Sequence, residues 1–387
     1  MAGKEAYSGF EQGPYRPPSE ASSLLLRVTR NCPWNHCTFC PLYKGSTFSR
    51  RPVDHVLQDI DRVRQYTEAL KQTLDRDGRI SHSTFMALLQ GGGRDEGSDR
   101  QALHAALNFV RGGMRSIFLQ DANSLILKPG DLIRILERLK ESFPGVERIT
   151  SYARAKTIAR ISGQDMERLA RAGLNRVHVG LESGSDAVLA RVKKGVDKAT
   201  QIEAGLKVRA AGMELSEYHM PGLGGKDLSR ENALETADAL NQINPDFIRL
   251  RSLALPEGAP LTEQHRQGEF TKLGEVDTAR ELLLFLESLG GITSKVRSDH
   301  ILNLFPEVDG TLPQDKDLLM APVREYLGLP AQEQLLYSLG RRSQAMSGLS
   351  DLRDPAKRHA AEQVRVALEA NVENMDVWVN RIMQGFV

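Results

Sequence analysis

Three cysteines lie close together in a chain of 387 residues that contains no others. Cys32, Cys37 and Cys40 have the spacing C-x4-C-x2-C. An odd number of thiols on one short loop cannot form a disulfide framework and is typical of a ligand set. A structural zinc site needs four ligands, so His36 or His55 would have to supply the fourth. Thiolates are the ordinary ligands of iron–sulfur clusters, and three of them leave one iron of a [4Fe–4S] cluster open.

The elements that must position this loop alternate regularly along the chain. Short apolar segments predict strands at 24–30, 116–120, 148–152, 176–181, 214–220 and 247–253. Helical periodicity predicts helices at 52–75, 131–142, 165–172, 186–194, 200–211 and 231–243. The alternation predicts βαβ units, and six strands indicate an α/β fold built as a partial (β/α)6 barrel. In such folds the chemistry lies at the carboxyl ends of the strands.

The remaining segments suggest the domain organisation. We expect a polar N-terminal segment at 1–21, the partial barrel at 22–260, and a helical C-terminal extension at 261–387. Residues 76–100 interrupt the pattern with Gly-rich and polar flanks around a short apolar core. We interpret them as an insertion or irregular loop that could contain one extra strand.

The composition is that of a globular protein. The chain carries 51 basic and 50 acidic residues, a net charge of +1, with 40% hydrophobic and 26% charged residues. The near-balance of charge predicts neither nucleic acid nor a membrane surface as a partner. The first twenty residues contain no secretory apolar region, and the apolar runs are too short to cross a bilayer. We therefore expect a cytoplasmic location.

The cysteine loop after the first strand, followed by the βα pattern, resembles the radical S-adenosylmethionine (radical SAM) superfamily. The usual family spacing is C-x3-C-x2-C, so this chain has one extra residue between the first two cysteines. The resemblance covers about residues 22–260 and is closest to the methylthiotransferase-like and coproporphyrinogen-dehydrogenase-like branches. Their extra domains are not expected, because no further cysteine could bind a second cluster.

The resemblance implies the cofactors and the chemistry. Cys32, Cys37 and Cys40 would hold a [4Fe–4S] cluster whose open iron binds S-adenosylmethionine (SAM). Reductive cleavage of SAM would give methionine and a 5′-deoxyadenosyl radical, which abstracts hydrogen from a substrate. A flavodoxin- or ferredoxin-type electron donor is also implied. Because no appendage for a macromolecule is evident, we expect a small-molecule substrate.

Polar residues after the second strand match the family positions that hold the amino group of SAM. These residues are Gln120, Asp121 and Asn123, whose oxygens could accept hydrogen bonds from an ammonium. The alternative is an Asx-turn that ends the strand. Gly91–Gly93 could instead match the family's Gly-Gly-Glu-like segment, although Arg94 stands where an acid is expected. A flexible loop is the alternative there.

The end of the fourth strand resembles the family's ribose and carboxylate site. Glu182 would accept hydrogen bonds from the ribose, and Lys194 would bind the carboxylate of SAM. Lys193 and Arg191 are alternates for the cation. Capping of the following helix is the alternative role for Glu182.

Further contacts with the cofactor are implied around these positions. Phe39 matches an aromatic residue that shields the cluster and the adenine, with plain packing as its alternative. Gly222 lies in a glycine-rich segment after the fifth strand, where a ligand can approach the backbone. Ser151 and Arg154 follow the third strand and are candidate contacts to the cofactor or substrate. Residues 247–253 match the apolar wall beside adenine.

The residues that act on the substrate are harder to identify. Tyr218, Asp299 and His300 are candidates, because a His next to an Asp can act as a general base. A surface or capping role is the alternative for His300. Two other protein classes stay open: a non-radical iron–sulfur protein with a structural or electron-transfer role, and a zinc-bearing binding module.

Overall fold

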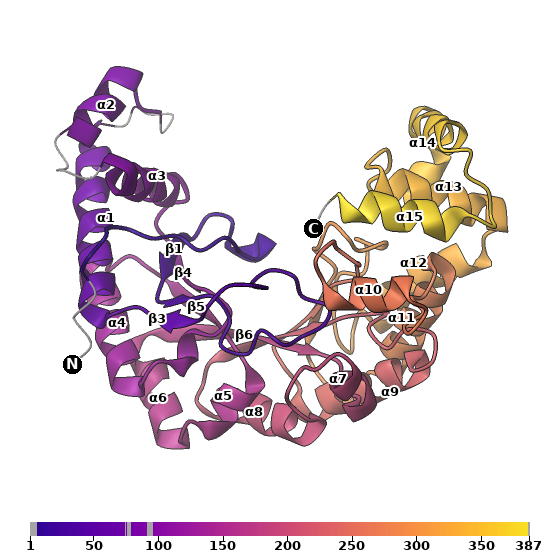
Figure 1. Ribbon diagram of the computed structural model, residues 1–387, viewed down its shortest axis with the longest axis horizontal. Helices are drawn as coiled ribbons and strands as arrows, with labels where there is room; N and C mark the ends of the chain where they lie inside the picture. Colours follow the sequence, from indigo (N-terminus) through magenta and orange to yellow (C-terminus); the bar gives the residue numbers. More distant parts are fainter. Residues whose placement is uncertain (1–5, 74, 76–78, 91–95, 386–387) are drawn as a thin grey trace. The chain divides into compact units, whose positions relative to one another are not determined.

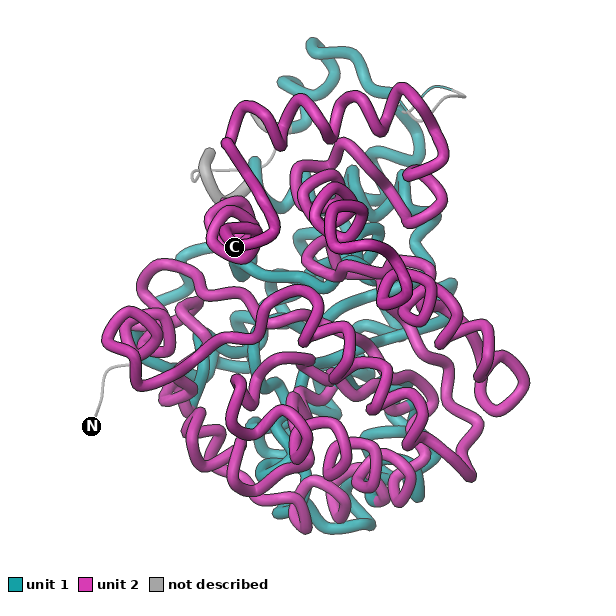
Figure 2. Tube along the Cα trace, turned by 90° about the vertical axis from the view of Figure 1, so that its right-hand side faces the viewer, with its two compact units in different colours: residues 1–33, 45–178, 207–214 teal, residues 34–44, 179–206, 215–387 magenta. Residues whose placement is uncertain are grey.

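A computed structural model describes residues 6–73, 75, 79–90 and 96–385. The chain forms two compact units that interleave along the sequence (Figure 2). Unit 1 comprises residues 1–33, 45–178 and 207–214, and unit 2 comprises residues 34–44, 179–206 and 215–387. Each unit is described by itself below.

The strands of unit 1 begin the sheet. β1 (Leu24–Arg27), β4 (Ser116–Gln120) and β5 (Arg148–Ala153) pair in parallel, and the first part of β6 (Leu174–Glu182) lies next in order. All five residues of β4 are buried, as expected for a strand covered on both faces. A separate antiparallel pair is formed by β2 (Thr29–Arg30) and β3 (Ser49–Arg50).

The helices of unit 1 cover its sheet. α1 lies against both α3 and α4 (Figure 1). In chain order the helices are η1 (Pro18–Glu20), α1 (Val53–Thr73), α2 (His82–Gln90), α3 (Glu96–Arg111), η2 (Ser124–Ile126), α4 (Pro129–Ser142), α5 (Ala155–Arg160) and α6 (Gly163–Ala172).

The strands of unit 2 begin with the last part of β6. β7 (Glu214–His219), β8 (Phe247–Leu250) and β9 (Lys295–Arg297) are parallel, and β10 (Gly310–Thr311) is antiparallel to β9. The helices after β6 are α7 (Asp186–Arg191), α8 (Lys198–Ala210, which ends in unit 1), α9 (Ser229–Ile243), α10 (Pro260–Arg266), α11 (Glu275–Ser288), α12 (Lys316–Gly328), α13 (Ala331–Arg342), η3 (Leu349–Arg353), α14 (Pro355–Ala367) and α15 (Met375–Gln384).

The predicted α/β class with a mostly parallel sheet is confirmed. The partial (β/α)6 barrel and the domain boundaries stay predictions. Two local expectations differ from the structure. The segment after residue 260 contains β9 and β10 as well as helices, because three-residue and two-residue strands leave no apolar pattern to detect. The apolar stretch near residue 85 belongs to helix α2 and is not an extra strand, since a short apolar run cannot by itself distinguish the two.

An apolar cluster fills the space at the carboxyl ends of β7 and β8 in unit 2. Its buried members are Val188, Val192, Met220, Leu223, Leu253, Leu255, Leu261 and Phe270. Phe39 of the cysteine loop and Leu228 pack against it. The cluster therefore connects the loops in which we expect the site with the rest of unit 2. No helix among the described residues is long and apolar enough to cross a membrane.

Candidate functional site

The cysteine loop is held in place by backbone hydrogen bonds and one tryptophan. In the part that belongs to unit 2, the Thr38 N–H donates to the carbonyl of Val192 at 3.0 Å, and the Thr38 carbonyl accepts from Leu261 N–H at 2.8 Å. The Trp34 indole N–H donates to the carbonyl of Lys193 at 2.7 Å. The indole lies over Gly195, where a Cβ would come within 2.2 Å of the ring. These contacts tie the loop to α7 and α10.

The three thiols have the donor chemistry of a cluster site. Cys32, Cys37 and Cys40 are half-buried, and none forms a disulfide. A structural zinc site takes four ligands on one ion, whereas a [4Fe–4S] cluster takes three thiolates, each on a different iron. The donor set therefore fits a cluster better than zinc.

Glu182 and Lys194, predicted together from the sequence, form an ion pair in unit 2. The Lys194 Nζ lies 3.1 Å from the Glu182 Oε1, and both side chains are largely buried. They meet over Gly180, where a Cβ would lie 2.3 Å from the Glu182 Oε1. The Lys194 Nζ is also 5.7 Å from the ring centroid of Phe39. An acceptor, a cation and an aromatic face are therefore grouped at the end of β6.

The backbone of Glu182 has a conformation that needs support. Its φ is +63°, in the left-handed region that most residues avoid. Its carbonyl accepts a hydrogen bond from Met220 N–H at 2.9 Å and lies 3.1 Å from the His219 Nδ1, both just after or at the end of β7. The alternative capping role for Glu182 is not observed, because the Ser185 side chain accepts from Val188 N–H and caps α7.

The two alternates to Lys194 point to other partners. Arg191 donates to the carbonyl of Gly224 at 3.0 Å and pairs with Asp227 at 3.3 Å. Lys193 contributes its carbonyl to Trp34. Of the three basic residues, Lys194 is the one paired with Glu182.

The glycine-rich segment after β7 is supported by a buried carboxyl group. Gly222 has a φ of +85° and donates its N–H to the Glu281 Oε1 of α11 at 2.8 Å. The same oxygen accepts from the Asn232 Nδ2 of α9 at 2.8 Å. Burial raises the pKa of Glu281 to about 7. No local pattern in the sequence indicates this support, because Glu281 lies 59 residues beyond Gly222.

This raised pKa predicts a pH dependence of stability. Between about pH 4.5 and pH 7 the folded chain keeps the Glu281 proton that the unfolded chain loses, so the free energy of unfolding falls as pH rises. Glu281→Gln keeps a neutral side chain with an acceptor oxygen. We expect the variant to lack this slope and to be more stable than the natural protein by ~2 kcal/mol at about pH 8.

Urea unfolding from about pH 5 to about pH 8 measures this effect. The comparison uses the difference between the two proteins, because burial lowers the pKa of His219 to about 4 and gives an opposite slope in both. Parallel curves for the two proteins would contradict the role of Glu281.

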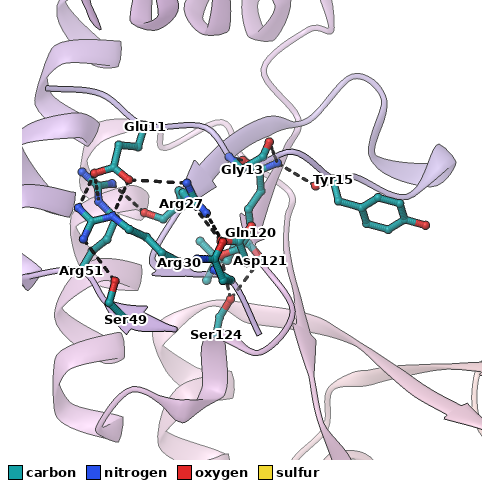
Figure 3. A network of polar contacts seen from close by, with 12 residues as sticks. Glu11, Gly13, Tyr15, Arg27, Arg30, Ser49, Arg51, Gln120, Asp121 and Ser124 are labelled. Atoms are coloured by element: carbon teal, nitrogen blue, oxygen red, sulfur yellow. Dashed lines mark hydrogen bonds and ion pairs between the residues drawn. The ribbon is translucent and has the colours of Figure 1, made fainter. Parts of the chain in front are cut away.

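The residues predicted to hold the amino group of SAM make contacts within unit 1 (Figure 3). The Gln120 amide accepts from Gly13 N–H at 2.8 Å and donates to the carbonyl of Tyr15 at 2.9 Å. Asp121 Oδ2 accepts from the Arg27 Nε at 2.8 Å. Their role at the cofactor stays a prediction, and the structure shows that these atoms already serve the N-terminal segment and β1.

The next two predicted residues lie nearby in unit 1. Asn123 donates to the Thr157 Oγ1 at 2.9 Å and accepts from Arg154 N–H at 3.1 Å. Ser151 is fully buried and donates to the carbonyl of Tyr152 at 3.0 Å. Both side chains therefore stabilise the turn after β4 and the end of β5. The triple-glycine segment 91–93 lies outside the described residues.

Asp299 and His300, candidates for action on the substrate, have separate partners in unit 2. Asp299 makes an ion pair with Arg249 of β8, and Arg249 also donates to the Ser216 Oγ at 3.2 Å. The His300 Nδ1 accepts from Leu302 N–H at 3.2 Å. Burial and the nearby Arg251 lower the pKa of His300 to about 4, so its imidazole is neutral at pH 7.

The sequence did not identify Arg249 as the partner of Asp299, because nothing in the local sequence distinguishes it from other arginines in strands. Its position on β8 brings it into register with Tyr218 on β7. Tyr218 keeps a buried side-chain hydroxyl on this part of the sheet. The catalytic roles of Tyr218, Asp299 and His300 stay predictions.

The chain is similar to two curated proteins and to one solved structure. The chain is 23% identical over 205 residues to the tRNA uridine(34) acetyltransferase of Methanocaldococcus infernus, covering 50% of this chain and 38% of the relative. It is 21% identical over 277 residues to the protein of the same name from Methanocaldococcus jannaschii, covering 68% and 48%. The chain thus spans less than half the length of these relatives. Coproporphyrinogen III oxidase of Escherichia coli is 17% identical with a TM-score of 0.42, over 69% of this chain and 52% of that one.

These relatives overturn one expectation from the sequence. Composition predicted no nucleic acid among the partners, yet both curated relatives are named for a tRNA substrate. The physical reason is that a net charge of +1 sums the whole chain and does not measure the field at one surface.

A family model described as the radical SAM superfamily matches residues 26–237. The match includes the three cysteines and the strand ends with Gln120, Glu182 and Gly222. Members of this family use a [4Fe–4S] cluster and SAM. The chain therefore belongs to the radical SAM superfamily, and it is an enzyme of that class.

Proposed function

We propose that Cys32, Cys37 and Cys40 hold the [4Fe–4S] cluster and that SAM binds beside them, over Glu182 and Lys194. The observation that carries this proposal is the Glu182–Lys194 pair, which lies next to Phe39 of the cysteine loop. The bound cofactors supply a 5′-deoxyadenosyl radical that abstracts hydrogen from the substrate.

Each residue of this part of unit 2 has a distinct task in the proposal. The Lys194 ammonium donates hydrogen bonds to the carboxylate of SAM, and the Glu182 carboxylate accepts them from the ribose hydroxyls. Phe39 and the apolar cluster after β7 and β8 pack against the adenine and exclude water. The Gly222 segment lets a ligand approach the backbone without a side chain in the way.

We propose RNA as the substrate class, with a uridine of tRNA as the reacting nucleoside. Support comes from the two curated relatives, whose names state a tRNA uridine(34) substrate. Hydrogen abstraction suits such a substrate, because the C–H bonds of a nucleoside offer neither an acidic proton nor a leaving group.

The test measures 5′-deoxyadenosine formed by anaerobically reconstituted, dithionite-reduced protein. We expect an unmodified tRNA transcript with uridine at position 34 to raise the rate by about tenfold over protein alone, since substrate completes the site. A transcript with cytidine 34 is the matched control. Equal stimulation by both transcripts would contradict uridine specificity, and no stimulation by either would contradict RNA as the substrate. No 5′-deoxyadenosine at all, with the cluster intact, would contradict the radical chemistry.

A further inference from the structure

The residue directly before the first cysteine is held by three hydrogen bonds within unit 1. Asn31 donates its backbone N–H to the Asp121 Oδ2 at 3.0 Å. Its side-chain Oδ1 accepts from the Arg27 Nη2 at 3.3 Å, and its Nδ2 donates to the carbonyl of Thr47 at 2.6 Å. Asn31 has a φ of +67°. A non-glycine residue keeps this unfavourable left-handed conformation when contacts with its surroundings stabilise it.

Asp121 is the centre of this arrangement. Its Oδ2 accepts both from Asn31 N–H and from the Arg27 Nε, the latter at 2.8 Å. The Asp121 carboxylate is completely buried, while Arg27 keeps 15% of its side chain exposed. A buried carboxylate with a guanidinium and a backbone N–H on one oxygen is charge-compensated and has one defined orientation.

The N-terminal segment closes the other side of Asp121 (Figure 3). At Gly13 a Cβ would come within 2.3 Å of the Asp121 Oδ1, so the backbone packs directly on the carboxylate. Glu11 pairs with Arg30 at 2.5 Å and lies 3.8 Å from the Arg27 Nη1. Arg27 and Arg30, the two arginines that precede Asn31, are therefore held by carboxylates from other segments of the chain.

We propose that Asp121, acting with Arg27, is a positioning residue for Cys32, which the proposed function assigns as a cluster ligand. Asp121 holds the backbone N–H of Asn31 and so sets the direction in which the chain enters the cysteine loop. The extra residue between Cys32 and Cys37 makes this loop longer than the usual family spacing, and a longer loop has more conformations to restrict. This role explains why Asp121 is buried beside an arginine and a backbone N–H at the end of β4.

The experiment compares anaerobically reconstituted Asp121→Ala, Asp121→Asn and the natural protein. Iron and sulfide content, the EPR spectrum of the reduced cluster, SAM affinity and thermal unfolding are measured. Loss of a group that orients a metal ligand typically weakens metal binding ~10–100-fold, so we expect Asp121→Ala to lose most of its iron during gel filtration. Asp121→Asn keeps an acceptor for Asn31 N–H and should retain iron with an altered EPR spectrum.

Asp61→Asn is the matched control, because Asp61 also pairs with an arginine of unit 1, Arg138, at 2.5 Å. It should keep the iron content and the EPR spectrum of the natural protein. If Asp121→Ala keeps its iron and EPR spectrum but loses SAM affinity, Asp121 binds the cofactor and does not position Cys32. If nothing changes, the inference is wrong. If the natural protein itself binds no iron, the proposed function fails first.

A second pair of variants applies if Asp121→Ala does not fold. Asn31→Gly adopts a positive φ freely but loses both side-chain hydrogen bonds, whereas Asn31→Ala also strains the backbone. We expect iron retention to fall in the order natural protein, Asn31→Gly, Asn31→Ala. Equal iron retention in all three would show that the conformation before Cys32 does not matter for the cluster.

Discussion

Replacing Cys32, Cys37 or Cys40 by alanine should abolish cluster assembly and SAM cleavage. A [4Fe–4S] cluster with three protein ligands has none to spare, because these are the only cysteines in the chain. We expect each variant to bind little iron after reconstitution and to form 5′-deoxyadenosine at least ~100-fold more slowly than the natural protein. Iron and sulfide analysis, the visible absorption band of the cluster and chromatography of the nucleoside products measure the effect.

His36→Ala and His55→Ala are the controls that separate a cluster from a zinc site. Either histidine would have to complete a tetrahedral zinc site with the three cysteines. The ring centroids of His36 and Trp34 are 4.9 Å apart, and those of His55 and Tyr7 are 5.4 Å apart. Both variants should keep the iron content of the natural protein. One equivalent of zinc, lost in either histidine variant, would contradict the cluster assignment.

Lys194→Met should weaken SAM binding by ~10–100-fold without loss of the cluster. A hydrogen bond to a charged group contributes about 1.5–3 kcal/mol, and the carboxylate of SAM would lose its cation. Methionine fills a similar volume and keeps the packing on Phe39, so the effect reports the charge. Glu182→Gln should have a smaller effect, because glutamine still offers an acceptor oxygen to the ribose. Equilibrium binding of SAM to the reconstituted protein measures both.

The double variant shows whether these residues touch the cofactor or only each other. If Lys194 and Glu182 bind different groups of SAM, their effects on the dissociation constant should multiply. If they serve only their mutual ion pair, the double variant should bind SAM no more weakly than either single variant. Lys198→Met is the control, since Lys198 also forms an ion pair with a glutamate of unit 2. Its Nζ lies 2.7 Å from the Glu235 Oε2. Its SAM affinity should not change.

Contacts between residues that are close along the chain are easier to expect from the sequence than contacts between distant segments. Glu182 and Lys194 were both assigned to the cofactor, and the structure brings them together as an ion pair across one short helix, α7. Their roles at the cofactor stay predictions. Gln120 and Asp121 were assigned to the cofactor from their strand end alone. Their observed partners lie 90 to 107 residues away, at Asn31 and Gly13, and no local pattern reports such contacts.

The amino-acid sequence by itself determined the family, the cofactors, the α/β class and the candidate ligands of the cluster. These properties depend on residue types at short spacings, where chain connectivity limits the geometry. Only the tertiary structure decided that Asp121 supports Asn31, that Glu281 supports Gly222, and that Asp299 pairs with Arg249. Each of these contacts joins separate elements, and their alignment depends on packing of the whole unit. A carboxylate looks the same in the sequence whether it meets a ligand or a distant part of its own chain.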